Sequence, residues 1–140
     1  MTYQGLVTRA IAFAVDAALI NLIALLVGVG VGVALSILSI PDYLQVVLLA
    51  CGGAAFVVWT VAYFAVFWST TGQTPGNRLM HIRVCGEDDG AALSLRRSLL
   101  RFGALLLAAL PLLAGFITVL VDDRRRGLHD MLAGTVVVGV

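Results

Sequence analysis

The chain has 140 residues, of which 61% are hydrophobic and 12% charged, and its mean hydropathy is +1.04. A soluble domain of this length could not bury so much apolar surface, so the composition excludes a soluble globular protein and predicts an integral membrane protein. The formal net charge is only +1, which argues against nucleic acid or another strongly charged partner.

The first hydrophobic segment covers about residues 8–38 and exceeds the ~20 residues that cross a bilayer. It is also longer than the ~7–15 apolar residues of a signal peptide, so we expect a retained helix. Inside it lies one charged residue, Asp16. An ionised carboxylate in hydrocarbon costs at least ~2.5 kcal/mol, so Asp16 is expected to have a buried ion partner, a transported ion or a gating role.

Two small residues in the same segment, Gly28 and Gly32, are four positions apart. Small residues at this spacing let membrane helices approach closely. They predict a helix–helix interface, either within this chain or with a partner.

The second hydrophobic segment covers about residues 44–68 and follows a short link in which Pro41 ends the first helix. Its last turns carry aromatic residues, which are typical of the membrane–water interface. The link contains no arginine, whereas the loop 69–101 contains five. The excess of positive charge predicts a cytoplasmic loop and therefore a cytoplasmic N-terminus.

Within this loop, the alternating residues Leu79–Val84 predict a short strand, and Ser94 is a candidate N-cap for a helix starting at Leu95. Glu87, Asp88 and Asp89 indicate a solvated turn. The β-branched residues near the C-terminus predict a second strand over Gly134–Val140.

The third hydrophobic segment, about residues 102–121, is long enough to cross the membrane once, but Pro111 lies in its middle. Arg124, Arg125 and Arg126 follow it and would be outside after a single crossing. A re-entrant segment broken at Pro111 would keep the tail 122–140 cytoplasmic, where its strand could pair with Leu79–Val84. We favour the re-entrant arrangement, and a single span is the alternative.

Depth in the membrane suggests partners for the buried charges. Arg9 and Asp16 are separated by about 10 Å along the helix, which is too far for a direct pair. Arg101 begins the third segment at a similar depth, so we expect it to pair with Asp16, and Asp130 to pair with Arg9. These residues predict an ion-pair network that sets helix register; the alternatives for Asp16 are a proton or cation site and a contact to a partner subunit.

Neither histidine has a metal-ligand pattern. His129 adjoins Asp130, but no further His or Cys lies at ligand spacing, and His81 is on the predicted strand. No nucleophile and base are paired. We therefore expect no catalytic residue, no metal and no cofactor, and hence no enzyme.

Three motifs together carry a family resemblance: Arg9 with Asp16, the loop Gly72–Leu79, and the tail Arg124–Val137. They resemble the RDD family of small bacterial membrane proteins, named for one arginine and two aspartates, over nearly the whole chain. The resemblance implies that Arg9, Asp16 and Asp130 are the signature positions and that the protein lies in the bacterial plasma (inner) membrane. Some members are linked to sodium or proton exchange, and others look like accessory subunits.

The sequence as a whole predicts one domain, residues 1–140, of the all-α membrane class: two full transmembrane helices, a third proline-interrupted segment and a small cytoplasmic β element. Two or three spans without an internal repeat are too few for an alternating-access path. We therefore expect a non-catalytic accessory or assembly subunit of a larger bacterial membrane complex, such as a transporter. The alternative is an oligomeric cation/proton exchanger that uses Asp16. Membrane lipids, and other membrane subunits or further copies, are the expected partners.

Overall fold

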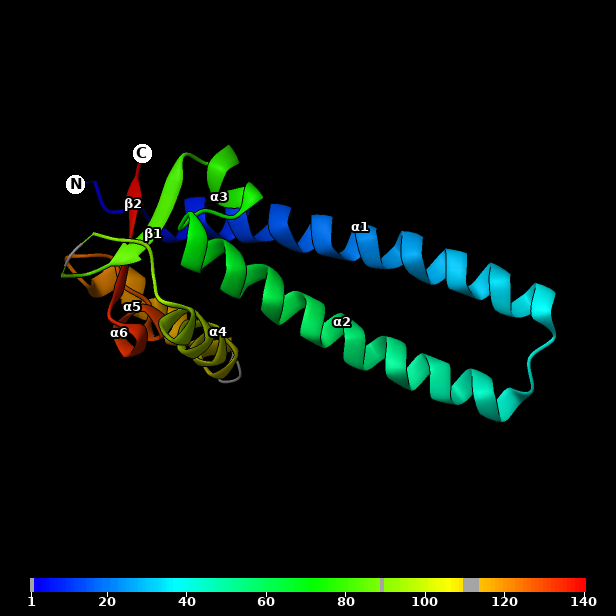
Figure 1. Ribbon diagram of the computed structural model, residues 1–140. Helices are drawn as coiled ribbons and strands as arrows, with labels where there is room; N and C mark the ends of the chain where they lie inside the picture. The colour runs from blue at the N-terminus through cyan, green and yellow to red at the C-terminus, as the bar shows by residue number, and fades with distance from the viewer. Residues whose placement is uncertain (1, 89, 110–113) are drawn as a thin grey trace.

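The computed structural model describes residues 2–88, 90–109 and 114–140. Its elements, in chain order, are α1 (Leu6–Leu38), α2 (Asp42–Thr70), α3 (Pro75–Leu79), β1 (Ile82–Gly86), α4 (Leu95–Ala109), α5 (Ala114–Val121), α6 (Leu128–Ala133) and β2 (Thr135–Gly139). The helices α1 and α2 form a long hairpin. All the other elements gather at the end of the hairpin where both chain ends lie, and we call them the base (Figure 1).

Both hairpin helices are long and apolar enough to cross a membrane, and they coincide with the two predicted hydrophobic segments. Each extends slightly beyond its predicted range, to Leu6 at the start of α1 and to Thr70 at the end of α2. The reversal between them is tight: Ser39 has left-handed backbone angles and ends α1, and Pro41 caps α2.

The far part of the hairpin is unpacked within this chain. From Asn21 to Leu38, and from Asp42 to Trp59, no residue is buried. The buried residues of the hairpin are confined to its near end, close to the base. The protein therefore has its core at one end and a bare pair of apolar helices at the other.

Aromatic side chains fill the core where the hairpin meets the base. The ring of Phe64 lies 5.7 Å from that of Phe13, 5.2 Å from that of Trp68 and 5.6 Å from that of Phe102. The sequence assigned the aromatic residues of α2 to the membrane surface, but Tyr63, Phe64 and Trp68 are buried. Packing against α4 explains the difference, since it removes these rings from the lipid.

The two strands form one antiparallel pair, with Ile82 opposite Gly139 and Gly86 opposite Thr135. The predicted pairing between loop and tail is thereby confirmed, but the first strand starts at Ile82 instead of Leu79. The reason is local. Thr74 accepts a hydrogen bond from the backbone of Asn77 and Pro75 occupies the first helical turn, so the residues up to Leu79 form α3.

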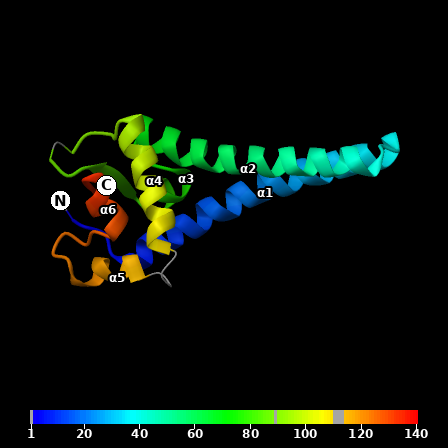
Figure 2. The ribbon, with the colours of Figure 1, turned by 90° about the horizontal axis from the view of Figure 1, so that it is seen from below.

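The third hydrophobic segment does not continue the hairpin. Its described residues fall in two helices, and the expected break at Pro111 lies outside the described residues. Ser94 caps α4 as predicted, accepting a hydrogen bond from Arg97 N at 3.3 Å. Figure 2 shows α4 lying across the end of the hairpin at a steep angle to it. In that position α4 packs against both α2 and α6.

Candidate functional site

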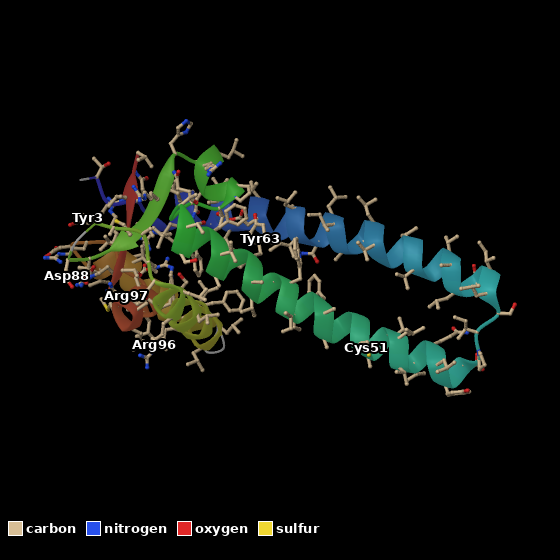
Figure 3. The ribbon with its side chains drawn as sticks, in the orientation of Figure 1. Tyr3, Cys51, Tyr63, Asp88, Arg96 and Arg97 are labelled. Atoms are coloured by element: carbon tan, nitrogen blue, oxygen red, sulfur yellow. The ribbon has the colours of Figure 1, made fainter. Side chains whose placement is uncertain are left out.

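Asp16 connects three elements through its carboxylate, and only 2% of the residue is exposed. Its Oδ1 accepts hydrogen bonds from the Tyr63 hydroxyl and from the backbone N–H of Gly76, each at 2.8 Å. Its Oδ2 accepts a hydrogen bond from the Thr74 hydroxyl at 2.5 Å. Tyr63 is on α2, at the end of the hairpin that carries the base (Figure 3). Asp16 therefore holds α1, α2 and α3 together.

The loop sequence is shaped to receive this carboxylate. Thr74 both caps α3 and donates to Asp16. A side chain at Gly76 would place its Cβ 2.1 Å from the carbonyl oxygen of Ala12 and 2.9 Å from the carboxyl carbon of Asp16. Only glycine allows α3 to approach α1 so closely.

The expected ion pair between Arg101 and Asp16 is wrong. Arg101 Nη1 instead contacts Oδ1 of Asp130. The prediction rested on similar depth in the membrane, but α4 crosses the end of the hairpin (Figure 2) and packs on α6, where Arg101 meets Asp130. Neutral donors stabilise Asp16 in its place.

Asp130 is the centre of a second cluster and is fully buried. Arg101 contacts Oδ1, and Arg9 contacts Oδ2, the pairing that the sequence suggested. The backbone N–H of Gly127 donates to Oδ2 at 2.9 Å. Burial by itself raises the pKa of Asp130, but the neighbouring guanidinium groups outweigh it and hold the pKa well below its usual range.

The two arginines attach this cluster to the rest of the chain. The guanidinium carbon of Arg101 lies 5.0 Å from the centre of the Trp68 ring, a cation–π arrangement. Arg101 Nη1 also donates to the Thr135 hydroxyl on β2. Arg9 donates from Nη2 to the carbonyl oxygen of Arg125 at 2.6 Å. The second cluster thus joins α1, α2, α4, α6 and β2.

His129 is buried beside this cluster, with its Nε2 3.5 Å from Oδ1 of Asp130. Burial lowers its pKa to about 4; the attraction of Asp130 opposes the shift, and the charges of Arg101 and Arg9 add to it. The imidazole is therefore neutral near pH 7 and packs inside the base.

The predicted interface at Gly28 and Gly32 is not formed with any described part of the chain. A Cβ added at either position would meet no atom within 4 Å. The helix surface there is open, so the prediction stands only for a partner.

A cavity of about 650 Å³ lies between the two charged clusters, where α1, α2, α4 and α5 meet. Arg9, Asp16, Arg101 and His129 line it together with mainly apolar side chains. Sequence reasoning missed Tyr63, Thr74, Gly76 and Trp68 as parts of the site. Thr74 and Gly76 belong to the loop motif Gly72–Leu79, which could have identified them as site residues. No motif in the sequence includes Tyr63.

Comparison with known proteins gives one match. The model of the RDD family matches residues 3–134, which is nearly the whole chain. No curated protein and no solved structure matches.

Proposed function

We propose that this chain, which belongs to the RDD family, is a non-catalytic accessory or assembly subunit of a larger membrane complex. The bare far part of the hairpin carries this proposal. Membrane helices associate by close packing of small residues, and the chain leaves its own small residues there unpacked. The open surfaces at Gly28 and Gly32 on α1, and at Gly52 and Gly53 on α2, suit the helices of a partner.

The two charged clusters support a structural role for the signature residues. The carboxylate of Asp16 is occupied by donors from α2 and α3, and that of Asp130 by Arg9 and Arg101. Both clusters attach the base to the hairpin. This arrangement favours a rigid base that presents the hairpin, and no step of ion exchange is needed to account for either aspartate.

The arrangement of the base supports a topology in which residues 102–121 do not cross the membrane. The helices α4 and α5 pack together, α6 packs on both, and β2 pairs with β1. A tail on the opposite side of the membrane could not make these contacts. With the arginine-rich loop and tail of the base on the cytoplasmic side of the bacterial plasma membrane, the N-terminus is cytoplasmic and the Ser39–Pro41 link is outside.

The second candidate function is cation/proton exchange by an oligomer. One observation favours it: Asp16 lines the cavity between the clusters. A carboxylate beside a cavity in a membrane protein is a common carrier of ions.

The test is gentle-detergent purification of the tagged chain from its native host, followed by mass spectrometry. The proposal expects a partner membrane protein at a fixed ratio, lost in the Gly28→Leu/Gly32→Leu variant but kept in Val29→Leu, which adds bulk on another face of α1. Recovery as a homo-oligomer whose cation/proton exchange in proteoliposomes is abolished by Asp16→Asn would refute the accessory role and establish the exchanger.

A further inference from the structure

The cavity between the charged clusters has a mouth made of apolar side chains. Phe13 of α1, Leu106 of α4 and Leu120 of α5 line it, and all three are exposed on the surface of the chain. In a bilayer such a mouth meets lipid. Its volume, about 650 Å³, falls within the range of ~300–1,000 Å³ that is typical of ligand sites.

The depth of the cavity matches a lipid standing beside the hairpin. Its lining on α1 runs from Leu6 to Asp16, which is about 15 Å along the helix axis. The headgroup layer on one side of a bilayer is only ~5–8 Å thick. The cavity therefore reaches from the headgroup layer into the layer of acyl chains.

The two ends of the cavity differ in charge. Arg9 and Arg101 both line one end and share a single carboxylate, that of Asp130, so this end has one positive charge in excess. Asp16 lines the cavity at the other cluster, where its hydrogen-bond donors, Tyr63 and the α3 segment, are neutral and leave it negatively charged. An anionic group is therefore favoured at the Arg9–Arg101 end.

Two hydrogen-bond donors in this wall are unused. Arg101 Nε and Trp68 Nε1 are buried, and neither has a hydrogen-bond partner among the described residues. Because the Arg101 guanidinium lies over the Trp68 ring, the two residues are in direct contact. Buried donors left without an acceptor destabilise the folded chain, and an anionic oxygen that reaches these two atoms would satisfy them.

We propose that this cavity binds one anionic phospholipid of the surrounding bilayer, with its phosphate against Arg101 and Trp68 and one acyl chain along Phe13 and Leu106. Basic pockets between membrane helices are a known way of holding anionic headgroups. The proposal does not depend on the accessory role, since a lipid in the base and a protein partner on the hairpin occupy different surfaces.

The experiment uses the full chain purified in a neutral detergent. Equal amounts of dioleoyl phosphatidylglycerol and dioleoyl phosphatidylcholine are added, and retained lipid is counted by native mass spectrometry. One phosphatidylglycerol per chain is expected, with about a tenfold preference over phosphatidylcholine. Both lipids carry a phosphate, but the trimethylammonium group of phosphatidylcholine is repelled by the excess positive charge of Arg9 and Arg101.

Neighbouring leucines on α4 supply a matched pair of variants. Leu106 lines the cavity and Leu107 does not, although both are exposed. Leu106→Trp should fill the mouth and lower phosphatidylglycerol retention about tenfold, whereas Leu107→Trp should leave it unchanged. Trp68→Phe keeps a ring beneath Arg101 but removes Nε1, so it should lower the retention of phosphatidylglycerol.

Equal retention of the two lipids would overturn the proposal, since it would show that charge plays no part. Equal effects of Leu106→Trp and Leu107→Trp would also overturn it by placing the lipid elsewhere. If Trp68→Phe fails to fold, the comparison of Leu106→Trp with Leu107→Trp still tests the proposal. Both leucines are exposed, so these substitutions leave the core unchanged.

Discussion

Two aspartates that look alike in the sequence are stabilised by different chemistry. Asp16 relies on a phenol, a hydroxyl and a backbone N–H, whereas Asp130 lies between two guanidinium groups. An ionised carboxylate can be buried in either way, provided that its oxygens are hydrogen-bonded. The two aspartates should therefore differ in their coupling free energies to Arg101, which can be measured.

A double-mutant cycle distinguishes the observed pairing of Arg101 from the one that the sequence suggested. Arg101→Ala and Asp130→Asn should be coupled by about 1–3 kcal/mol, because the residues are in direct contact. Arg101→Ala and Asp16→Asn should be additive within ~0.5 kcal/mol. The free energy of unfolding of each variant in detergent gives both couplings. Strong coupling to Asp16, with none to Asp130, would contradict the structure.

His129 predicts a loss of stability in mild acid. Its pKa is about 4 in the folded chain and about 6.5 when unfolded, so the unfolded state takes up the proton first. Stability is therefore full above pH 6.5 and falls as the pH drops to about 4, by roughly 3 kcal/mol. The midpoint of thermal unfolding measured across this range should fall less in His129→Gln than in the parent chain.

The exposed His81 supplies the control for the substitution itself, since His81→Gln makes the same change outside the buried cluster. An unchanged profile in His129→Gln would mean that the acid sensitivity comes from other groups.

At the scale of the elements, the short helix α3 is the piece that fastens the loop to α1. Its first turn lies directly against Ala12 and Asp16, where Gly76 leaves no room for a Cβ. Elsewhere in the base, Arg97 of α4, which is labelled in Figure 3, donates hydrogen bonds to the carbonyl oxygens of Ala133 and Gly134. The α3 segment thus attaches the loop to α1, and α4 attaches the end of α6 to the rest of the base.

Gly76→Ala should weaken this attachment. The added Cβ would meet backbone atoms of α1 and force α3 away from Asp16, which should destabilise the chain by at least ~1–3 kcal/mol. Thermal unfolding and protease cleavage of the loop would both report the change. Gly103→Ala on α4 is the control, since nothing lies within 4 Å of a Cβ there. Equal stability of the two variants would show that α3 does not pack as described.

The turn that follows β1 is in contact with the C-terminal tail, which the sequence did not predict. Glu87, assigned from the sequence to a solvated turn, forms ion pairs with Arg124 and Arg126 of the tail. Asp89 of the same turn lies outside the described residues. The pairs are partly exposed, so they orient the tail more than they stabilise it.

At the scale of the whole molecule, the proposed topology places the loop and the tail of the packed base on the same side of the membrane. In a background with Cys51→Ala, a cysteine is introduced at Ser39, Arg96 or Asp123, one position in each variant. Each variant is then treated in intact cells with a membrane-impermeant maleimide. Arg96 is exposed on α4 (Figure 3) and Asp123 follows α5. We expect labelling at position 39 alone, and labelling of all three positions only after the membrane is opened.

A single crossing by residues 102–121 would instead expose position 123 together with position 39. Cys85 can remain in the background because it is buried. Labelling of position 123 in intact cells would therefore contradict the same-side arrangement of loop and tail.

Local patterns in the sequence determined the two long apolar helices, the two strands and the cap at Ser94, because hydropathy, β-branching and capping act over a few residues or along one helix. The expected contact between Arg9 and Asp130, which are 121 positions apart, came from placing the tail on the same side as the N-terminus. The local patterns began the first strand at Leu79, which is the last residue of α3. They also misplaced the aromatic residues of α2 and the partner of Asp16. Those features depend on α4 crossing the end of the hairpin, which brings Arg101 to Asp130 and buries Trp68. A contact between segments so far apart in the chain leaves no periodic signal in either one, so only the tertiary structure could decide it.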